Sequence, residues 1–583
     1  FSLHNHAMTT GLNPQQQAAV EQCHGPVLVL AGAGSGKTRV ITHKIAHLIN
    51  KKGYDPRHIA AVTFTNKAAR EMRERVSGVM QNASTEGLTV STFHSLGLSI
   101  LHREARQAGL KPGFSIFDAE DSAKLFRELH KGDRDVLNAA RWTISGWKNA
   151  GLDPQTAREQ AQSNQQYTAL LYGEYQRHLS AYNAVDFDDL LRMPMHLLNT
   201  QADIRQRWQN RFRYLLVDEY QDTNTAQYQL LRQLAGPDPR FTLVGDDDQS
   251  IYGWRGADRE NIALLKTDYS QLEVIKLEQN YRSCTHILNA ANHLIQGNTR
   301  LFEKKLWSDM GAGDKLRILD CDSGEDEAQT VAAELIAHRM RSGQNMNASY
   351  AILYRSNHQA RAFEQVLRER NVRYKVSGGQ SFFERSEVRD LLGYLRLLVN
   401  PDDDTAFLRV INTPRREIGA TTLEKLGAYA QKRTVSLYDA ASELTRFGAD
   451  VAGLAPAAVH RLDEFVQWTR GLMVAAEDEA PGSLTRRLVR DIDYMDWLQL
   501  NERNKAAAER RLANVEELLR WLDRLGEENE ASGRAAKNLT EAVNHLGLMD
   551  RLDGNEETED HQYVQLMTLH AAKGLEFDHV FLV

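Results

Sequence analysis

One glycine-rich segment limits how this 583-residue chain can fold more than any other feature of its sequence. The segment reads AGAGSGKT over residues 31–38, between an apolar run at 26–30 and a helical pattern from Thr38 to Ile49. Glycines at this spacing let backbone N–H groups surround phosphate oxygens, and the N-terminus of the following helix faces the anion. The order of strand, loop and helix therefore predicts a phosphate-binding loop in an α/β domain.

Three more apolar segments predict further strands of this domain, at 59–64, 214–217 and 241–244. Short apolar strands that alternate with helices are typical of a parallel sheet. The interval between the segments at 59–64 and 214–217 is too long for a loop. Its helical patterns at 118–129 and 167–182 predict an inserted helical subdomain. Polar residues follow the strand ends, where such sheets bind their ligands.

The second half of the chain repeats this organisation. Strands are predicted at 316–319 and 351–354, a long helical stretch runs from about 386 to 546, and strand character returns at 564–567 and 580–583. The simplest scheme is an α/β protein with two cores, each of which carries a mainly helical inserted subdomain.

Composition excludes several classes of function. Lys and Arg number 71 and Asp and Glu number 78, a formal net charge of −7, which argues against a histone-like nucleic-acid binder but allows a local basic channel. No apolar run approaches the ~20 residues of a membrane helix, so no membrane partner is expected. Three scattered cysteines suit neither a disulfide framework nor a zinc site, and they favour a reducing cytoplasm.

The phosphate loop and the acids after the third strand together predict hydrolysis of a nucleoside triphosphate. Lys37 is expected to reach the β- and γ-phosphates, and Thr38 and Asp218 are expected to hold Mg²⁺. Glu219 stands at the same strand end and is expected to orient and deprotonate the attacking water. These residues do not indicate what the hydrolysis drives.

Longer motifs resemble those of superfamily 1A DNA helicases, in the UvrD/Rep/PcrA group and closest to its Rep branch. They read VDEYQDTN at 217–224, LVGDDDQSIYGWRGA at 243–257, LEQNYRS at 277–283 and TLHAAKGLE at 568–576, with shorter matches at 12–16, 62–69 and 91–97. The resemblance implies two RecA-like P-loop cores and an ATP-dependent DNA helicase and single-stranded DNA translocase. It also implies 3′ to 5′ movement and a role in DNA replication or repair.

The resemblance also implies a division of the chain. The first core is expected at 8–93 and 200–280, its helical insertion at 94–199, the second core at 281–377 and 549–583, and a mobile helical insertion at 378–548. Hinges are expected near Gly378 and Gly379 and in the acidic segment 550–561. The family carries a further Q-x-x-R motif after the position of Glu576, so we expect a second core that is truncated at its C-terminus, with poor turnover.

Roles at the nucleotide are implied residue by residue. Gln16 resembles the glutamine that reads adenine, Tyr281 the ring that stacks on it and Glu576 the ribose contact. Arg282 resembles an arginine that reaches the γ-phosphate, and Gln249 the residue that senses this phosphate and links it to the DNA site. The other expected contacts are the loop and the residue after it, namely Ala31, Gly32, Ala33, Gly34, Ser35, Gly36, Lys37, Thr38 and Arg39.

Stacking on aromatic rings lets a protein bind single-stranded DNA without reading its sequence. Tyr252 and Trp254 flank a glycine, and Arg255 follows, so this loop offers two rings and a cation. Further positions match DNA contacts of the family: Phe64, Thr65, Asn66, Phe93, His94, Phe187 and His570. The expected partners are single-stranded DNA and tailed or forked duplex DNA, together with replication or repair proteins. The basic segments 368–375 and 409–416 fit either DNA phosphates or a solvated face.

Three other functions stay open on the sequence alone. The same motor suits a translocase that displaces bound proteins but unwinds little, and it suits a subunit of a helicase–nuclease. An ATP-gated DNA-binding module without catalysis would carry the same motifs.

Overall fold

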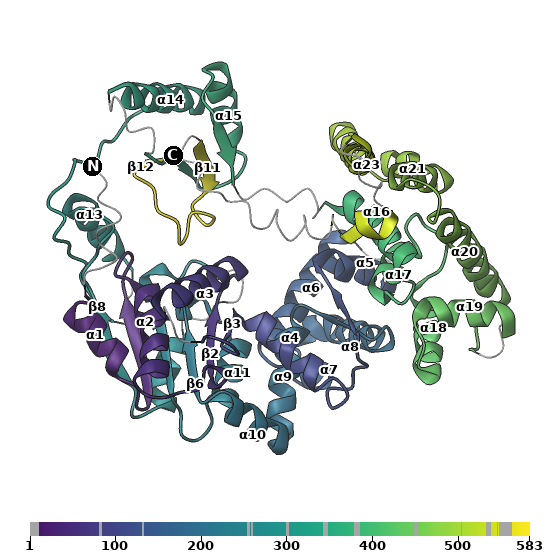
Figure 1. Cartoon of the computed structure of the whole chain (residues 1–583), viewed down its shortest axis with the longest axis horizontal. Helices are drawn as coiled ribbons and strands as arrows, with labels where there is room; N and C mark the ends of the chain where they lie inside the picture. The colour runs from purple at the N-terminus through teal and green to yellow at the C-terminus, as the bar shows by residue number, and fades with distance from the viewer. Residues whose placement is uncertain are drawn as a thin grey trace.

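The computed structural model of the chain describes residues 11–80, 84–130, 133–253, 257, 260–298, 302–341, 348–377, 385–447, 452–502, 504–531, 538–544, 546 and 563–583. Two parallel sheets, both drawn in Figure 1, form two α/β cores, and many helices surround them. None of the helices in the described ranges is long and apolar enough to cross a membrane.

The first sheet has six parallel strands in the order β3-β2-β6-β7-β1-β8. In chain order they are β1 (Pro26–Ala31), β2 (Ile59–Thr63), β3 (Thr89–Thr92), β6 (Tyr214–Val217), β7 (Phe241–Gly245) and β8 (Glu273–Leu277). In β1, Val27 and Val29 join one buried cluster, and Leu28 and Leu30 join another. Successive side chains of a strand point to opposite faces, so the sheet is buried on both faces, as the continuous apolar runs predict.

Helices cover the two faces of this sheet. One buried cluster takes side chains from α1 (Pro14–Glu21), α2 (Lys37–Asn50) and α3 (Asn66–Met80). The other takes them from α4 (Phe93–Arg103), α9 (Asp189–Thr200), α10 (Ala202–Arg211), α11 (Thr225–Ala235) and α12 (Glu260–Asp268). Short 3₁₀ turns η1 (Pro56–His58), η3 (Tyr220–Asp222) and η4 (Asp247–Gln249) connect these elements. The sheet therefore presents its functional groups at the strand ends and not on its faces.

The segment between β3 and β6 is mainly helical, but α4 and α9, which lie almost entirely within the insertion expected at 94–199, pack on the first sheet. Between α4 and α9 it contains a two-stranded parallel sheet and four α-helices. The elements are β4 (Ser115–Phe117), α5 (Ala119–Leu129), α6 (Arg134–Asn149), α7 (Pro154–Gln160), η2 (Ser163–Gln165), α8 (Gln166–Ala181) and β5 (Ala184–Asp186). The buried ammonium of Lys148 pairs with Asp186 at 2.7 Å and with Asp189 at 3.0 Å, which compensates the burial of all three charges.

The second sheet has four parallel strands in the order β10-β11-β9-β12. The strands are β9 (Tyr350–Tyr354), β10 (Tyr374–Val376), β11 (Val564–Thr568) and β12 (His579–Leu582). Three helices belong to the same part of the chain: α13 (Thr285–Ile295), α14 (Gly324–Arg341) and α15 (Ala360–Glu369). The strand predicted at 316–319 is wrong. In the described residues, this apolar run pairs with no neighbouring strand. Its side chains therefore stay at the surface, and Ile318 is 96% exposed.

A second, larger helical insertion lies between β10 and β11. Its helices are α16 (Ser386–Val399), α17 (Asp404–Val410), α18 (Ala420–Arg433), α19 (Leu437–Phe447), α20 (Pro456–Ala475), α21 (Pro481–Asp491), α22 (Tyr494–Asn501) and α23 (Lys505–Ala531). These helices share one apolar cluster with α5, α6 and α8 of the first insertion. A Cβ on Gly427 would lie 2.3 Å from the carbonyl oxygen of Ala181, so only glycine permits this close approach.

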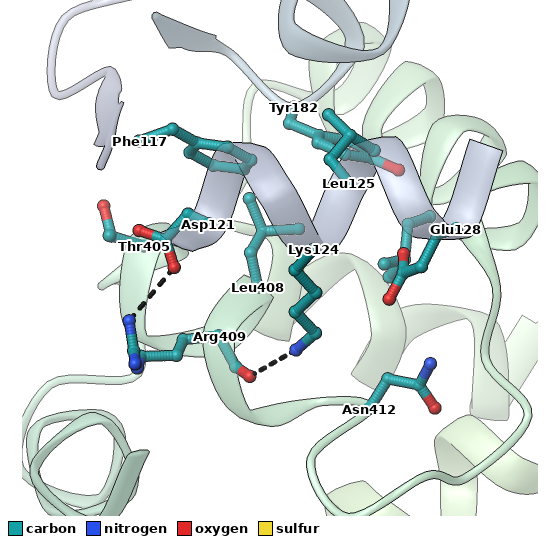
Figure 2. A pocket seen from close by; sticks show the side chains of 11 residues that line it. Phe117, Asp121, Lys124, Leu125, Glu128, Tyr182, Thr405, Leu408, Arg409 and Asn412 are labelled. Carbon is teal, nitrogen blue, oxygen red and sulfur yellow. Dashed lines mark hydrogen bonds and ion pairs between the residues drawn. The ribbon is translucent and has the colours of Figure 1, made fainter. Parts of the chain in front are cut away.

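A charged network borders this shared apolar core. Figure 2 shows Arg409 and Asp121 facing each other beside a small pocket, with Lys124 reaching the Arg409 carbonyl oxygen at 2.9 Å. The Arg409 guanidinium pairs with Asp121 at 3.1 Å and with Asp390 at 2.9 Å, and Asp118 and Glu120 lie within 4 Å. Burial raises the pKa of Asp390, and Arg409 opposes that shift. One buried cation therefore holds acids of both insertions.

We expect Arg409→Ala to destabilise the contact between the two insertions, because it leaves four carboxylates without their shared cation. Removal of one partner of a buried ion pair costs roughly 3–5 kcal/mol. Arg415→Ala is the matched control, since Arg415 lies in the same segment and is exposed. Urea unfolding measures both variants. Equal unfolding midpoints for the two would show that Arg409 does not stabilise the contact.

Candidate functional site

The predicted functional residues gather at the carboxyl ends of β1, β6 and β7. These strands are parallel neighbours in the first sheet, so the segments that follow them leave at one edge. The phosphate loop follows β1, the acidic pair follows β6, and η4 with Gln249 follows β7. Three segments that are far apart in the sequence therefore meet at one site.

The loop adopts a backbone that glycine makes accessible. Gly34 and Gly36 have φ angles of 65° and 83°, in the left-handed region. Gln16 closes the loop from α1 by donating from Nε2 to the carbonyl oxygen of Ser35 at 2.9 Å. Gly36 precedes α2 and has no side chain to cap it, so the first N–H groups of this helix remain for an anion.

Lys37 connects the loop to the other two strand ends. Its Nζ lies 3.2 Å from Glu219 Oε2 and donates to Gln249 Oε1 at 3.4 Å. Glu219 has a φ of 51°, which is uncommon for a residue with a side chain and typical of functional sites. The loop cation, the acid after β6 and the glutamine after β7 therefore form one connected group.

The adjacent acids Asp218 and Glu219 differ in their affinity for protons. Burial, followed by the charge of Glu219, raises the pKa of Asp218 to about 7. Burial alone would raise the pKa of Glu219 as well, but the cations Lys37 and Lys573 hold it below its usual value. Such a difference between neighbouring carboxyl groups is typical of sites that separate the roles of two acids. Glu219 is therefore ionised at neutral pH.

The surroundings of Asp218 suit a divalent cation. Its carboxylate is buried, and Lys37 is paired with Glu219 instead. Thr38 offers a hydroxyl in the first turn of α2, and carboxylate and hydroxyl oxygens are the ligand types that Mg²⁺ takes. A buried carboxylate and a hydroxyl are thus donors of the chemical type that fits magnesium.

Asp246 joins the η4 turn to the acid site. Its carboxylate accepts hydrogen bonds from the side chains of Gln249 and Lys304, and its N–H donates to Gln221 Oε1 at 2.9 Å. Gln221 Nε2 in turn donates to Glu219 Oε2. Gln249 and Glu219 are thus held by one hydrogen-bonded network, in addition to their common contact with Lys37.

Lys304 is a member of this network that the sequence analysis did not find. Its Nζ contacts the carboxylates of Asp246, Asp247 and Asp248, and its side chain is only 3% exposed. The three aspartates are close enough together to hold a metal ion, but the lysine ammonium already contacts all three carboxylates. The segment FEKKLW gives no sign of this role, because the lysine meets the acids only in the folded chain.

A segment of the second core reaches this site. Figure 1 shows the yellow stretch between β11 and β12 descending toward the first sheet. Lys573 from this stretch pairs with Asp222 and donates to the Gln249 carbonyl oxygen at 2.9 Å. Arg282 pairs with Glu576 at 2.8 Å. The second core therefore contacts the acid site through Lys573, which was not predicted, and the predicted residues Arg282 and Glu576 pair with each other.

Tyr281 lies on the same side of the phosphate loop as Gln16. Its N–H donates to the carbonyl oxygen of Gly34 at 2.9 Å, and its hydroxyl accepts from Asn13 Nδ2 at 2.9 Å. Asn280 Nδ2 donates to the carbonyl oxygen of Ala33 at 2.6 Å. The Tyr281 ring is 47% exposed, so one face remains available to a ligand.

The predicted DNA residues form two aromatic groups. Phe64 stacks on Tyr252 with ring centroids 5.3 Å apart and planes 16° apart, and His570 lies 6.2 Å from Tyr252. This first group joins both cores. His94 and Phe187 form the second group at 5.5 Å, and the Phe187 ring is 54% exposed.

Other predicted DNA residues are placed differently. Phe93 is 4% exposed and packs in the core beneath the first sheet, because it begins α4 and faces inward, so its predicted contact with DNA does not fit its position. Thr65 and Asn66 are exposed at the start of α3, where the Thr65 hydroxyl accepts from the Ala68 N–H at 3.1 Å. Trp254 and Arg255 lie outside the described residues, as do the predicted hinges at Gly378, Gly379 and 550–561.

The basic segment 409–416 is mostly used inside the protein. Arg409 holds the acids between the insertions. Arg416 donates to the Tyr394 hydroxyl at 2.7 Å and to the Val410 carbonyl oxygen at 2.9 Å. Of the arginines in this segment, Arg415 is the one that is exposed, so the segment offers little charge to DNA.

Two family models match the chain. The UvrD/REP helicase N-terminal domain matches residues 12–270, and the UvrD-like helicase C-terminal domain matches residues 275–583.

Named relatives agree with these models. The ATP-dependent DNA helicases Rep of Salmonella typhimurium and of Escherichia coli are each 49% identical to the chain, over 98% of it and 84% of their own length. The ATP-dependent DNA helicase PcrA of Bacillus subtilis is 38% identical over 99% of the chain and 77% of its own length. Because the matches run through nearly the whole chain, they give no support to the expected truncation of the second core.

We expect Lys304→Met to destabilise the first core by roughly 3–5 kcal/mol, because three aspartates at the end of β7 lose their buried cation. Lys305→Met is the control, since it makes the same change at the neighbouring, exposed position. Thermal unfolding compares the two. A Lys304 variant as stable as the Lys305 variant would contradict the neutralising role.

Proposed function

The chain belongs to the UvrD/REP helicase family, and from this premise we propose that it is an ATP-dependent DNA helicase and single-stranded DNA translocase that acts in DNA replication or repair. The observation that carries the proposal is the meeting of the two cores at one charged site. Lys37 of the first core contacts Glu219 and Gln249, Lys573 of the second core contacts Asp222 and the Gln249 carbonyl oxygen, and Arg282 lies against Gly34 of the phosphate loop. ATP bound there touches both cores, so its hydrolysis changes how they fit together.

Two cations are proposed to move to ATP when it binds. Lys37 pairs with Glu219, and Arg282 pairs with Glu576, in the nucleotide-free arrangement. Phosphate oxygens attract both side chains more strongly than a half-exposed carboxylate does, because they carry more charge. Lys37 thus approaches the β- and γ-phosphates, Arg282 approaches the γ-phosphate as an arginine finger does, and Glu576 is released toward the ribose.

Glu219 is the proposed general base, and the residues proposed to orient it already contact it before ATP binds. A water oxygen attacks the γ-phosphorus, the bond to the bridging oxygen of ADP breaks, and the water proton passes to Glu219. Gln221 donates to the Glu219 carboxylate and thereby fixes its direction. Lys573 also lowers the pKa of Glu219, so it continues to oppose the effect of burial on this carboxylate after Lys37 moves to the phosphates.

Thr38 and Asp218 are proposed to hold Mg²⁺, which when bound neutralises charge on the phosphates. The raised pKa of Asp218 supports this assignment, since a buried carboxylate needs a cation to stay ionised. Gln16 and Tyr281 are proposed to bind adenine from the exposed side of the phosphate loop, with Ala31, Gly32, Ala33, Gly34, Ser35, Gly36 and Arg39 around the phosphates.

Gln249 is proposed to transmit the state of the nucleotide to DNA. It contacts Lys37 on the nucleotide side, and only two residues separate it from Tyr252. Tyr252 stacks on Phe64 of the first core and donates to the His570 carbonyl oxygen of the second at 3.3 Å. A shift between the cores therefore changes these stacking surfaces, which suits stepwise release and capture of bases. We also propose that the protein moves from 3′ to 5′ along the single strand.

The organisation inferred from the sequence completes the proposal. Two RecA-like cores form the motor, and the helical insertion at 378–548 regulates unwinding by changing its contact with the insertion at 94–199. Arg409 and the shared apolar cluster support this idea, because they give the contact a definite geometry.

Glu219→Gln is expected to abolish DNA-stimulated ATP turnover while leaving ATP binding nearly unchanged. The amide keeps the size of the side chain but cannot accept the water proton. Glu74→Gln, at an exposed position on α3, is the control. Phosphate release and the binding of a fluorescent ATP analogue measure the two properties. Turnover that survives in the Glu219 variant would remove it as the base.

Phe64→Ala is expected to weaken binding of oligo-dT by about 1–3 kcal/mol, or roughly 5–150-fold, because it removes a stacking ring. Trp142→Ala removes a ring of similar character that is 67% exposed on α6, away from this group, and serves as the control. Fluorescence anisotropy of labelled oligo-dT measures the affinity. Similar affinities for both variants would exclude Phe64 from the DNA site.

A further inference from the structure

A second charged cavity lies at the opposite edge of the first sheet. His58 directly precedes β2 and Arg213 directly precedes β6, so both stand at the amino ends of parallel strands, away from the phosphate loop. The cavity has a volume of about 640 Å³. Besides His58, its lining includes five arginines: Arg57, Arg103, Arg207, Arg211 and Arg213.

Positive charge in this cavity exceeds the negative charge around it. Glu104 pairs with Arg207 at 2.9 Å, and Asp55 pairs with Arg57 at 2.6 Å. Among the described residues, no carboxylate forms an ion pair with the other three arginines, Arg103, Arg211 and Arg213. A surplus of cations in one hollow of an acidic chain is unfavourable unless an anion compensates it.

Two of the arginines, Arg103 and Arg211, lie against the buried ring of Trp208. Trp208 is buried, and the guanidinium carbons of Arg103 and Arg211 lie 6.0 and 5.3 Å from its ring centroid. The indole Nε1 of Trp208 donates to Glu104 at 3.2 Å. The buried Nε of Arg211 has no hydrogen-bond partner among the described residues. Donors positioned in advance lose little freedom when an anion arrives.

We propose that this cavity binds a phosphate-bearing anion, the chemistry shared by a nucleic-acid backbone and a free polyphosphate. Guanidinium groups match phosphate oxygens with paired hydrogen bonds. The volume is in the range of small-ligand sites. The buried ring of Trp208 offers no face for a base, so recognition is of phosphate and not of nucleobases. This site is independent of the proposed motor, which lies at the other strand ends.

Calorimetric titration with sodium tripolyphosphate tests the proposal, on protein whose nucleotide site is saturated with ADP and Mg²⁺. The parent chain should bind one tripolyphosphate. The double variant Arg103→Gln with Arg211→Gln should bind it at least about tenfold more weakly, because two charged donors are lost. Arg106→Gln with Arg158→Gln, at exposed positions outside the cavity, is the matched control and should bind like the parent.

Each remaining outcome is decisive. If the double variant unfolds, Arg213→Gln replaces it, because this exposed residue lines the cavity but is not one of the arginines that lie over the Trp208 ring in the described residues. No binding by the parent, equal binding by parent and variant, or equally tight binding of polyglutamate would overturn the phosphate site. Competition identifies the source of the anion. Displacement of tripolyphosphate by oligo-dT indicates a nucleic-acid backbone, and simultaneous binding of both indicates a free polyphosphate.

Discussion

Lys37 holds three strand ends of the first sheet in contact, and the arrangement of the whole site follows from this. Its ammonium lies between Glu219 and Gln249, so the loop after β1 is tied to the segments after β6 and β7. A phosphate group that competes for this lysine must disturb both partners at once. In the proposed function, nucleotide binding and the position of Gln249 are therefore linked by one charge, without any long-range pathway.

Three other cations with little exposed surface each contact two or more carboxylates. Lys304 holds the aspartates after β7, Lys148 holds two in the first insertion, and Arg409 holds four acids between the insertions. Lys573 pairs with one carboxylate, that of Asp222, and this pair joins the two cores. Such contacts are specific in geometry and cost much when one partner is lost, so they suit a protein whose parts must meet in defined arrangements.

Local patterns in the sequence predicted the elements that bury apolar side chains. The strands at 26–30, 214–217 and 351–354 agree with β1, β6 and β9 to within one residue, because each is a continuous apolar run in a doubly covered sheet. The run at 316–319 looks the same but forms no strand, since pairing depends on a neighbour and not on composition. Three residues of the site were not predicted. Lys573 and Gln221 lie within the helicase-like motifs at 568–576 and 217–224, whereas Lys304 lies in no such motif.

The sequence by itself determined the phosphate loop, the acids after β6 and the family, because these depend on residue types at short, regular spacings. Only the tertiary structure decided which charges meet. The pairing of Arg282 with Glu576, the burial of Phe93 and the arginines gathered around Trp208 join residues far apart in the chain, or depend on which face of a helix turns inward. Electrostatic and packing energies depend on distances in space, and the order of neighbouring residues in the sequence does not determine those distances.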